Sequence, residues 1–271
     1  MKQIPSLLLA AVLMAAIPNE RGTIETIEKK IKALKRVDYQ VFSKGEELEY
    51  VVHYGFVYAG KATIEVVGSK KNNKGQELTH VKGTGFSTGA FDWFFKVRDT
   101  YESYINAESM NPELFVRRVD EGGYKINQDY KFNHEQNVVV NQSKEKYEIP
   151  EGIQDMMSAF YYARTIDFTN VKKGDVFTMY AFVDNEIEPL GIKFYGRRTI
   201  ETEAGEFKCL AFQPRVLKGK VFKEEDDLLV YVTDDKNRIP VMVEAKILVG
   251  SVKMELESYK GLTHDVALVK N

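Results

Sequence analysis

Along most of the chain after residue 44, hydrophobic and polar side chains alternate with a period of two. This period is typical of β-strands in a sheet that buries one face and exposes the other. The first such strand has a strongly aromatic face, formed by Leu48, Tyr50, Val52, Tyr54, Phe56 and Tyr58. We expect Ala59-Gly60 to turn the chain into a second strand over residues 61–66.

The same alternation predicts many further short strands, separated by glycine-containing or charged turns. They fall at residues 78–82, 115–119, 124–132, 138–140, 177–183, 192–195, 198–202, 207–213, 228–233, 241–249 and 252–256. Short strands at such close spacing are typical of antiparallel sheets and barrels. The sequence therefore predicts a mainly β fold, built as an antiparallel, strongly curved sheet or open barrel with one covering helix.

The covering helix is predicted from residues 153–165, where the hydrophobic period changes from two to that of a helix. One apolar face is formed by Ile153, Met156, Met157, Phe160 and Ala163. We expect this helix to be buried against the sheet. It would divide a single β-rich domain, residues 40–271, into two strand-rich halves.

A second helical segment lies in a lead-in that we assign to residues 17–39. Its apolar positions share one face, and Thr23 is placed to cap the N-terminus. A Lys-rich amphipathic helix of this kind can lie on a membrane surface. Because the face has only four apolar positions, Ile24, Ile27, Ile31 and Leu34, we favour a short helix packed on the domain.

Residues 1–16 have the pattern of a secretory signal peptide. Lys2 precedes an apolar run of about 14 residues, and Ala15 and Ala16 offer small side chains for cleavage. The run is shorter than the ~20 residues that a spanning helix needs; a buried N-terminal helix or an uncleaved anchor are the alternatives. No cysteine follows the run, which excludes a lipidated cysteine, and no later segment predicts a transmembrane span. We therefore expect an exported protein.

The charge and cysteine content exclude some partners and some chemistry. A net charge of −2 gives no reason to expect nucleic acid as a partner. The single cysteine, Cys209, cannot form an internal disulfide. It alternates with polar neighbours in a predicted strand, so we expect a buried thiol rather than a nucleophile.

No motif of the chain indicates catalysis, a cofactor or a metal. The four histidines, His53, His80, His134 and His264, are widely separated. No Gly-x-Ser-x-Gly motif is present. The glycine-rich stretch 83–89 lacks the lysine of a phosphate-binding loop, and we interpret it as a bulged bend. We predict no catalytic residue, no metal ligand and no cofactor, and we favour a binding protein over an enzyme.

The candidate site is suggested by residues 83–105, a glycine-punctuated aromatic block that holds the only tryptophan, Trp93. Arg98-Asp99 follows the aromatic residues within this block, and Arg117-Arg118 lies in a later strand. These charges either pair across neighbouring strands or form the polar mouth of an aromatic cavity. Under the second interpretation, the candidate ligand-binding residues are Tyr50, Tyr54, Phe56, Trp93, Arg98, Tyr101 and Arg117.

Several blocks of the sequence carry a resemblance to a known family. Residues 45–60, 88–99, 115–124, 155–164 and 232–241 resemble the exported bacterial family called domain of unknown function 3108, over roughly residues 40–262. The resemblance implies a Gram-negative envelope protein, in the periplasm, and supplies no reaction and no catalytic residues. The hairpin near residues 234–241 is also similar to the closing strands of periplasmic lipoprotein carriers.

The function that we predict is a non-catalytic envelope protein that binds a lipid-like or other hydrophobic ligand in a concave sheet. Apolar support would come from the Met156-Met157 helix, and Arg98 and Arg117 would meet a polar head group. One alternative is an enzyme or binder acting on envelope polysaccharide, with Asp92 or Asp99 in proton transfer. Another is a structural partner in an envelope complex. The protein partners and the oligomeric state are unknown.

Overall fold

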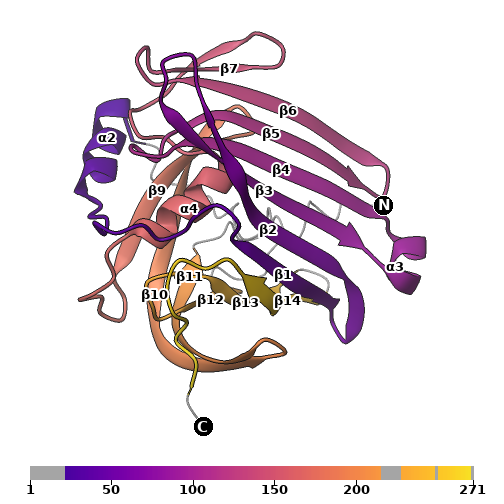
Figure 1. Ribbon diagram of the computed structural model, residues 1–271. Helices are drawn as coiled ribbons and strands as arrows, with labels where there is room; N and C mark the ends of the chain where they lie inside the picture. Colours follow the sequence, from indigo (N-terminus) through magenta and orange to yellow (C-terminus); the bar gives the residue numbers. More distant parts are fainter. Residues whose placement is uncertain (1–21, 215–226, 248–249, 270–271) are drawn as a thin grey trace.

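The computed structural model describes residues 22–214, 227–247 and 250–269; the predicted signal peptide lies outside them. Within these ranges the chain forms a single antiparallel sheet of 14 strands, strongly curved as predicted (Figure 1). The strands are β1 (Glu47–Tyr54), β2 (Val57–Lys71), β3 (Glu77–Ser87), β4 (Val97–Asn106), β5 (Pro112–Glu121), β6 (Tyr124–Asn133), β7 (Val138–Asn141), β8 (Lys146–Glu148), β9 (Val176–Val183), β10 (Glu186–Thr202), β11 (Gly205–Pro214), β12 (Leu228–Thr233), β13 (Pro240–Lys246) and β14 (Ser251–Lys260).

The strand order is that of a meander whose first and last strands pair. From edge to edge it runs β8-β7-β6-β5-β4-β3-β2-β1-β14-β13-β12-β11-β10-β9, so only the β1–β14 contact joins strands distant in sequence. The two edges, β8 and β9, are consecutive in the chain and do not pair. The sheet therefore consists of two arms joined at β1–β14, and it is curved but not closed.

Helix α4 (Met156–Thr165) connects the two edges and lies on the concave side of the sheet (Figure 1). Its N-terminus is fixed by a capping box between Asp155 and Ser158. The Ser103 hydroxyl of β4 donates to the Asp155 carboxylate over 2.6 Å. Eight of the ten helical residues are buried, which confirms the predicted covering helix.

The gap between the sheet edges is bridged by contacts from the segment before α4 and from the β9–β10 turn. The backbone N–H of Gln154 donates to Tyr180 of β9, and the Phe182 N–H donates back to Gln154. From β5, Arg117 reaches Asp184 in the β9–β10 turn at 3.1 Å. These contacts hold the free edge of the C-terminal arm against the interior of the N-terminal arm.

Helix α2 (Ile24–Ala33) packs at the β9 side of the sheet. Thr23 caps it as predicted, and Ile27 is its buried residue. None of the helices in the described ranges is long and apolar enough to span a membrane.

Three local predictions were wrong. The chain turns at Gly55-Phe56 and not at Ala59-Gly60, because Gly55 adopts a positive φ of 58° and ends the alternation there. The bulged bend expected at residues 83–89 is mostly strand, since β3 continues through Ser87 in regular register with β2 and β4, and a short helix, α3 (Gly89–Phe94), follows it. The expected strands 192–195 and 198–202 are one continuous strand, β10, since a bulge near Gly196 interrupts its pattern and not its pairing.

Candidate functional site

A cavity lies beneath α3, on the concave face of the N-terminal arm; we call it the α3 cavity. Its volume is about 120 Å³, and its walls are mainly apolar. The aromatic side chains among its lining residues are His53, Tyr54, Phe86, Phe91, Phe94, Phe95 and Tyr101. The rings of Tyr54 and Phe91 lie 6.1 Å apart, which brings the end of β1 next to α3.

Small residues on adjacent strands leave the space of this cavity. Ala62 of β2 pairs with Gly85 of β3, which pairs with Asp99 of β4, so all three face the same side. A Cβ atom added at Gly85 would meet no atom within 4 Å. At the neighbouring Gly60, by contrast, a Cβ atom would lie 2.2 Å from the Phe86 carbonyl oxygen, so only glycine permits this close approach of β2 and β3.

The floor of the α3 cavity is polar and carries two carboxyl groups. Asp99 and Glu121 both line it, and Glu121 is only 4% exposed. Burial raises the pKa of Asp99, and hydrogen bonds with Glu121 and with the Asp120 N–H oppose the rise. The Arg117 guanidinium, also buried, lies 5.7 Å from the ring centre of Tyr101. The floor thus combines two acids and a phenol, with the Arg117 cation behind the Tyr101 ring.

Helix α3 is fixed over the cavity by a polar clamp at its base. The Ser87 hydroxyl donates to Asp92 over 2.5 Å and accepts from the Val97 N–H over 2.7 Å. Arg98 pairs with Asp92 at 2.7 Å. The hydrogen bonds from Arg98 and Ser87 lower the pKa of Asp92. The clamp keeps the aromatic side chains of α3 in one orientation.

A second cavity, the α4 cavity, lies between α4 and the C-terminal arm. It measures about 110 Å³, and its lining is almost wholly apolar. Residues from both arms contribute, among them Ile64, Phe160, Met179, Leu190, Phe212, Val230 and Met254. Tyr50 is joined to a lining residue of each cavity: its strand partner Ala62 lines the α3 cavity, and its hydroxyl donates over 3.0 Å to the carbonyl of Pro240, which lines the α4 cavity.

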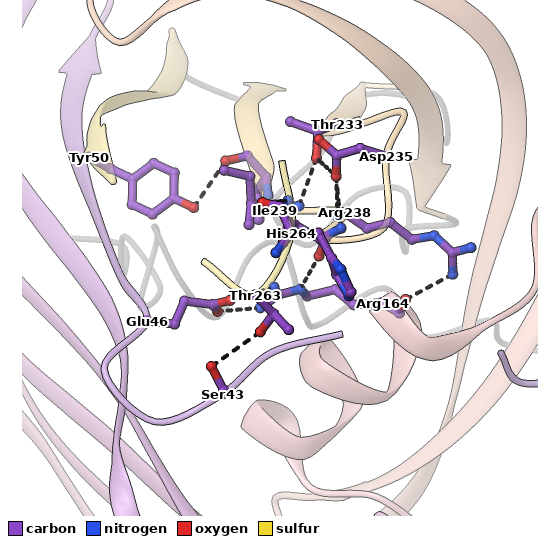
Figure 2. Close-up of polar contacts among 12 residues, drawn as sticks. Ser43, Glu46, Tyr50, Arg164, Thr233, Asp235, Arg238, Ile239, Thr263 and His264 are labelled. Carbon is purple, nitrogen blue, oxygen red and sulfur yellow. Dashed lines mark hydrogen bonds and ion pairs between the residues drawn. The ribbon is translucent and has the colours of Figure 1, made fainter. Parts of the chain in front are cut away.

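The polar end of the α4 cavity is a buried network around α4 (Figure 2). Arg164 forms two hydrogen bonds with the Glu46 carboxylate, at 2.6 and 2.8 Å, and a third with the Asn237 carbonyl. Arg238 donates to the carbonyls of Arg164 and Ile166 at the C-terminus of the helix, where a cation is favoured. Both arginines line the cavity with their hydrogen bonds directed to protein groups, so this end is structural.

The structure brings some of the predicted site residues together and separates others. Tyr54 and Tyr101 line the α3 cavity, and Arg117 lies behind Tyr101. Tyr50 is buried and pairs with the lining residue Ala62, without lining the cavity itself. Arg98 belongs to the clamp. Phe56 and Trp93 protrude into solvent beside the cavity, Trp93 with 92% of its surface exposed.

Sequence reasoning missed several residues that shape the two cavities. The small residues Gly60, Ala62 and Gly85 were interpreted as turn, strand and bend residues, although small side chains at inward-facing positions are the signal that predicts a hollow. Glu121 was not among the candidate residues. The α4 cavity was missed altogether, because its walls come from both arms and only the β1–β14 pairing brings these together.

The sequence establishes the family of the chain. A model of the family described as protein of unknown function, DUF3108, matches residues 49–257, so the chain belongs to this family. A search of curated proteins finds no match.

Among solved structures, the fold is similar to a β-barrel-like protein of domain of unknown function DUF1849 from Brucella abortus. The TM-score is 0.52 at 9% identity, and the match covers 82% of this chain and 99% of the other. A protein with a YmcC-like fold from Bacteroides fragilis, described as a "putative exported protein", matches with a TM-score of 0.34 and 12% identity, and the match covers 81% of this chain and 97% of the other. At these identities the comparisons concern the fold alone.

Proposed function

We propose that this chain is an exported envelope protein that binds the hydrocarbon part of a lipid-like ligand in the concave face of its sheet, without catalysis. The observation that carries the proposal is the α3 cavity, an apolar hollow with a few convergent polar groups on its floor. Such a combination is the usual form of a site for a small amphiphilic ligand. A periplasmic location is part of the proposal and is supported by the signal-like N-terminus.

The volume of the α3 cavity limits what it can hold. Its 120 Å³ is close to the ~150 Å³ of an engineered apolar cavity that binds benzene. One ring or a short length of acyl chain therefore fits. The α4 cavity is a second apolar space of similar size.

The acids on the floor favour binding over glycoside hydrolysis. A hydrogen bond with Glu121 opposes the rise in the pKa of Asp99, which supports a close approach of the two carboxyl groups. The two carboxyl groups of a glycosidase are held about 5 Å or more apart, so that a sugar or a water fits between them. A hydrogen-bonded acid pair instead suits recognition of a donor group on the ligand.

The test is to fill the cavity without disturbing the fold. A Gly85→Val substitution would place two methyl groups in the open space beneath α3. The matched control is Gly68→Val, on the same strand pair, outside both cavities, and with only the flexible end of Lys44 near the added Cβ. Both positions are in strands, where valine is preferred over glycine, so both variants should remain folded.

Binding is measured by titration with the neutral apolar probe N-phenyl-1-naphthylamine and by native mass spectrometry of protein purified from its envelope without detergent. We expect Gly85→Val to lower the affinity for the probe at least tenfold and to remove any adduct of lipid mass, with Gly68→Val unchanged. Equal binding by the wild type and both variants, or no binding by the wild type, would overturn the proposal.

A further inference from the structure

A group of large apolar side chains is exposed at one end of the N-terminal arm; we call it the aromatic tip. It consists of Phe56 and Val57 in the β1–β2 turn and Trp93 and Phe94 of α3. Phe56 is fully exposed, and Phe94 is 79% exposed. The β1–β2 turn and α3 lie at the same end of the sheet (Figure 1), and α3 packs on β2.

The exposure of the aromatic tip is imposed by the fold. The clamp of Ser87, Asp92 and Arg98 fixes α3 so that Trp93 and Phe94 point away from the core. The β1–β2 turn is tied to the next hairpin by the Gly55 N–H, which donates to the Ser251 carbonyl over 2.9 Å. The protein thus holds apolar groups in water at fixed positions, which indicates an interaction surface.

The aromatic tip is continuous with the α3 cavity. Phe94 belongs to both, since it is exposed at the tip and also lines the cavity. Phe91, on the inner side of the same helix, packs near Tyr54 inside the cavity. An apolar ligand could therefore pass from whatever the tip contacts into the cavity while remaining next to apolar side chains.

The charges around the aromatic tip favour an anionic surface. Arg98 neutralises Asp92, and Lys61 is paired with Glu257 at 2.6 Å. Lys96, at the end of α3, forms no ion pair with another residue of the described ranges. Among the exposed charges beside α3, one positive charge therefore has no ion-pair partner in the described ranges, which complements anionic head groups. The acids Asp99 and Glu121 lie on the cavity floor beneath the helix.

From these observations we infer that the aromatic tip docks the protein onto an anionic lipid surface, with Phe56, Trp93 and Phe94 inserted at the level of the head groups. Tryptophan and phenylalanine above a cationic residue are typical of side chains that bind at a membrane interface. Two protruding points suit insertion into lipid better than they suit the flat area of about 800 Å² that each partner buries in a stable protein complex. Docking of the aromatic tip does not depend on the proposed function; only the entry of a lipid-like ligand into the α3 cavity rests on it.

The single tryptophan makes the test direct, because all tryptophan emission comes from Trp93. The mature chain, residues 17–271, is titrated with vesicles of phosphatidylethanolamine and phosphatidylglycerol. We expect a blue shift of the emission maximum, quenching by brominated acyl chains, and co-sedimentation with the vesicles. Phe56→Ser should weaken vesicle binding at least fivefold. The matched control is Val67→Ser, an exposed apolar residue of β2 outside the tip, which should bind as the wild type does.

The outcomes distinguish membrane docking by the aromatic tip from binding of a protein partner and from ligand binding in the cavity. Unchanged Trp93 emission in the presence of vesicles overturns the docking inference, whether or not the protein sediments with them, and so does equal weakening by Phe56→Ser and Val67→Ser. Unchanged Trp93 emission is the result expected if the aromatic tip binds only a protein partner. Docking and ligand binding are also separable: Gly85→Val should still dock on vesicles, and Phe56→Ser should still bind the apolar probe in their absence.

Discussion

Glu46 and Arg164 form a buried ion pair with two hydrogen bonds, in which the residue just before β1 is joined to the last turn of α4. The Glu46 side chain is fully buried, and that of Arg164 is 3% exposed. The pair therefore fixes the covering helix to the centre of the sheet, where the two arms meet.

Removing one member of this pair should be costly. Arg164→Met would leave the Glu46 carboxylate buried without its partner, and such a change typically costs about 3–5 kcal/mol. Urea unfolding should show this loss. The double variant Glu46→Gln/Arg164→Met removes both charges and should lose less than the sum of the single variants; additive losses would contradict a coupled pair.

The stability of the fold should depend on pH through Asp155. Burial raises the pKa of Asp155 to about 7, whereas an exposed aspartate titrates near 3.9. Between about pH 4 and 7 the folded protein retains a proton that the unfolded chain releases, so the free energy of unfolding falls as the pH rises, by on the order of 4 kcal/mol. The loss is complete above pH 7.

Asp155→Asn tests this linkage, because asparagine also caps helices well. The variant should show a flatter dependence of stability on pH across the same window, measured by urea unfolding at a series of pH values. If the free energy of unfolding of the variant changed with pH as steeply as that of the wild type, another titrating group would cause the pH dependence.

Tyr50 should contribute to stability through its hydroxyl as well as its ring. Tyr50→Phe removes the hydrogen bond to the Pro240 carbonyl and keeps the ring, and it should cost about 1 kcal/mol. Thermal unfolding measures the loss. Unchanged thermal stability would contradict a contribution from this hydrogen bond.

Cys209 should be unreactive in the folded protein. The thiol is buried in β11, and burial raises its pKa to about 12, so almost no thiolate is present at neutral pH. Labelling with 5,5′-dithiobis(2-nitrobenzoic acid) should be absent under native conditions and complete in guanidinium chloride. Rapid labelling of the native protein would contradict the buried thiol.

The fold class was predictable because it follows from local periodicity. The period-two alternation located most strands, and the face of residues 153–165 located α4, since burial on one side of an element leaves a repeat in the sequence. The short strand β8 was missed because three residues are too few to show a repeat. The β1–β2 turn was misplaced because the aromatic pattern continues through Gly55, and only its positive φ reveals the reversal.

The candidate site was predictable only in part. Tyr54 and Tyr101 were expected to line a cavity and do so. Phe56 and Trp93 were expected in the same wall, yet an exposed tip and a cavity wall have the same aromatic composition, and alternation does not distinguish them. The hollow itself depends on registers such as Ala62–Gly85–Asp99, which are set by pairing across three strands.

The pairing of β1 with β14 also bears on how the chain reaches its fold. Two strands about two hundred residues apart must meet before the arms can close, so the topology is rich in non-local contacts and should fold slowly. During synthesis, which starts at the N-terminus, one edge of β1 stays unpaired until β14 has been made. During that interval the open edge can recruit other extended chains, so truncation before residue 251 should produce aggregates rather than a folded half.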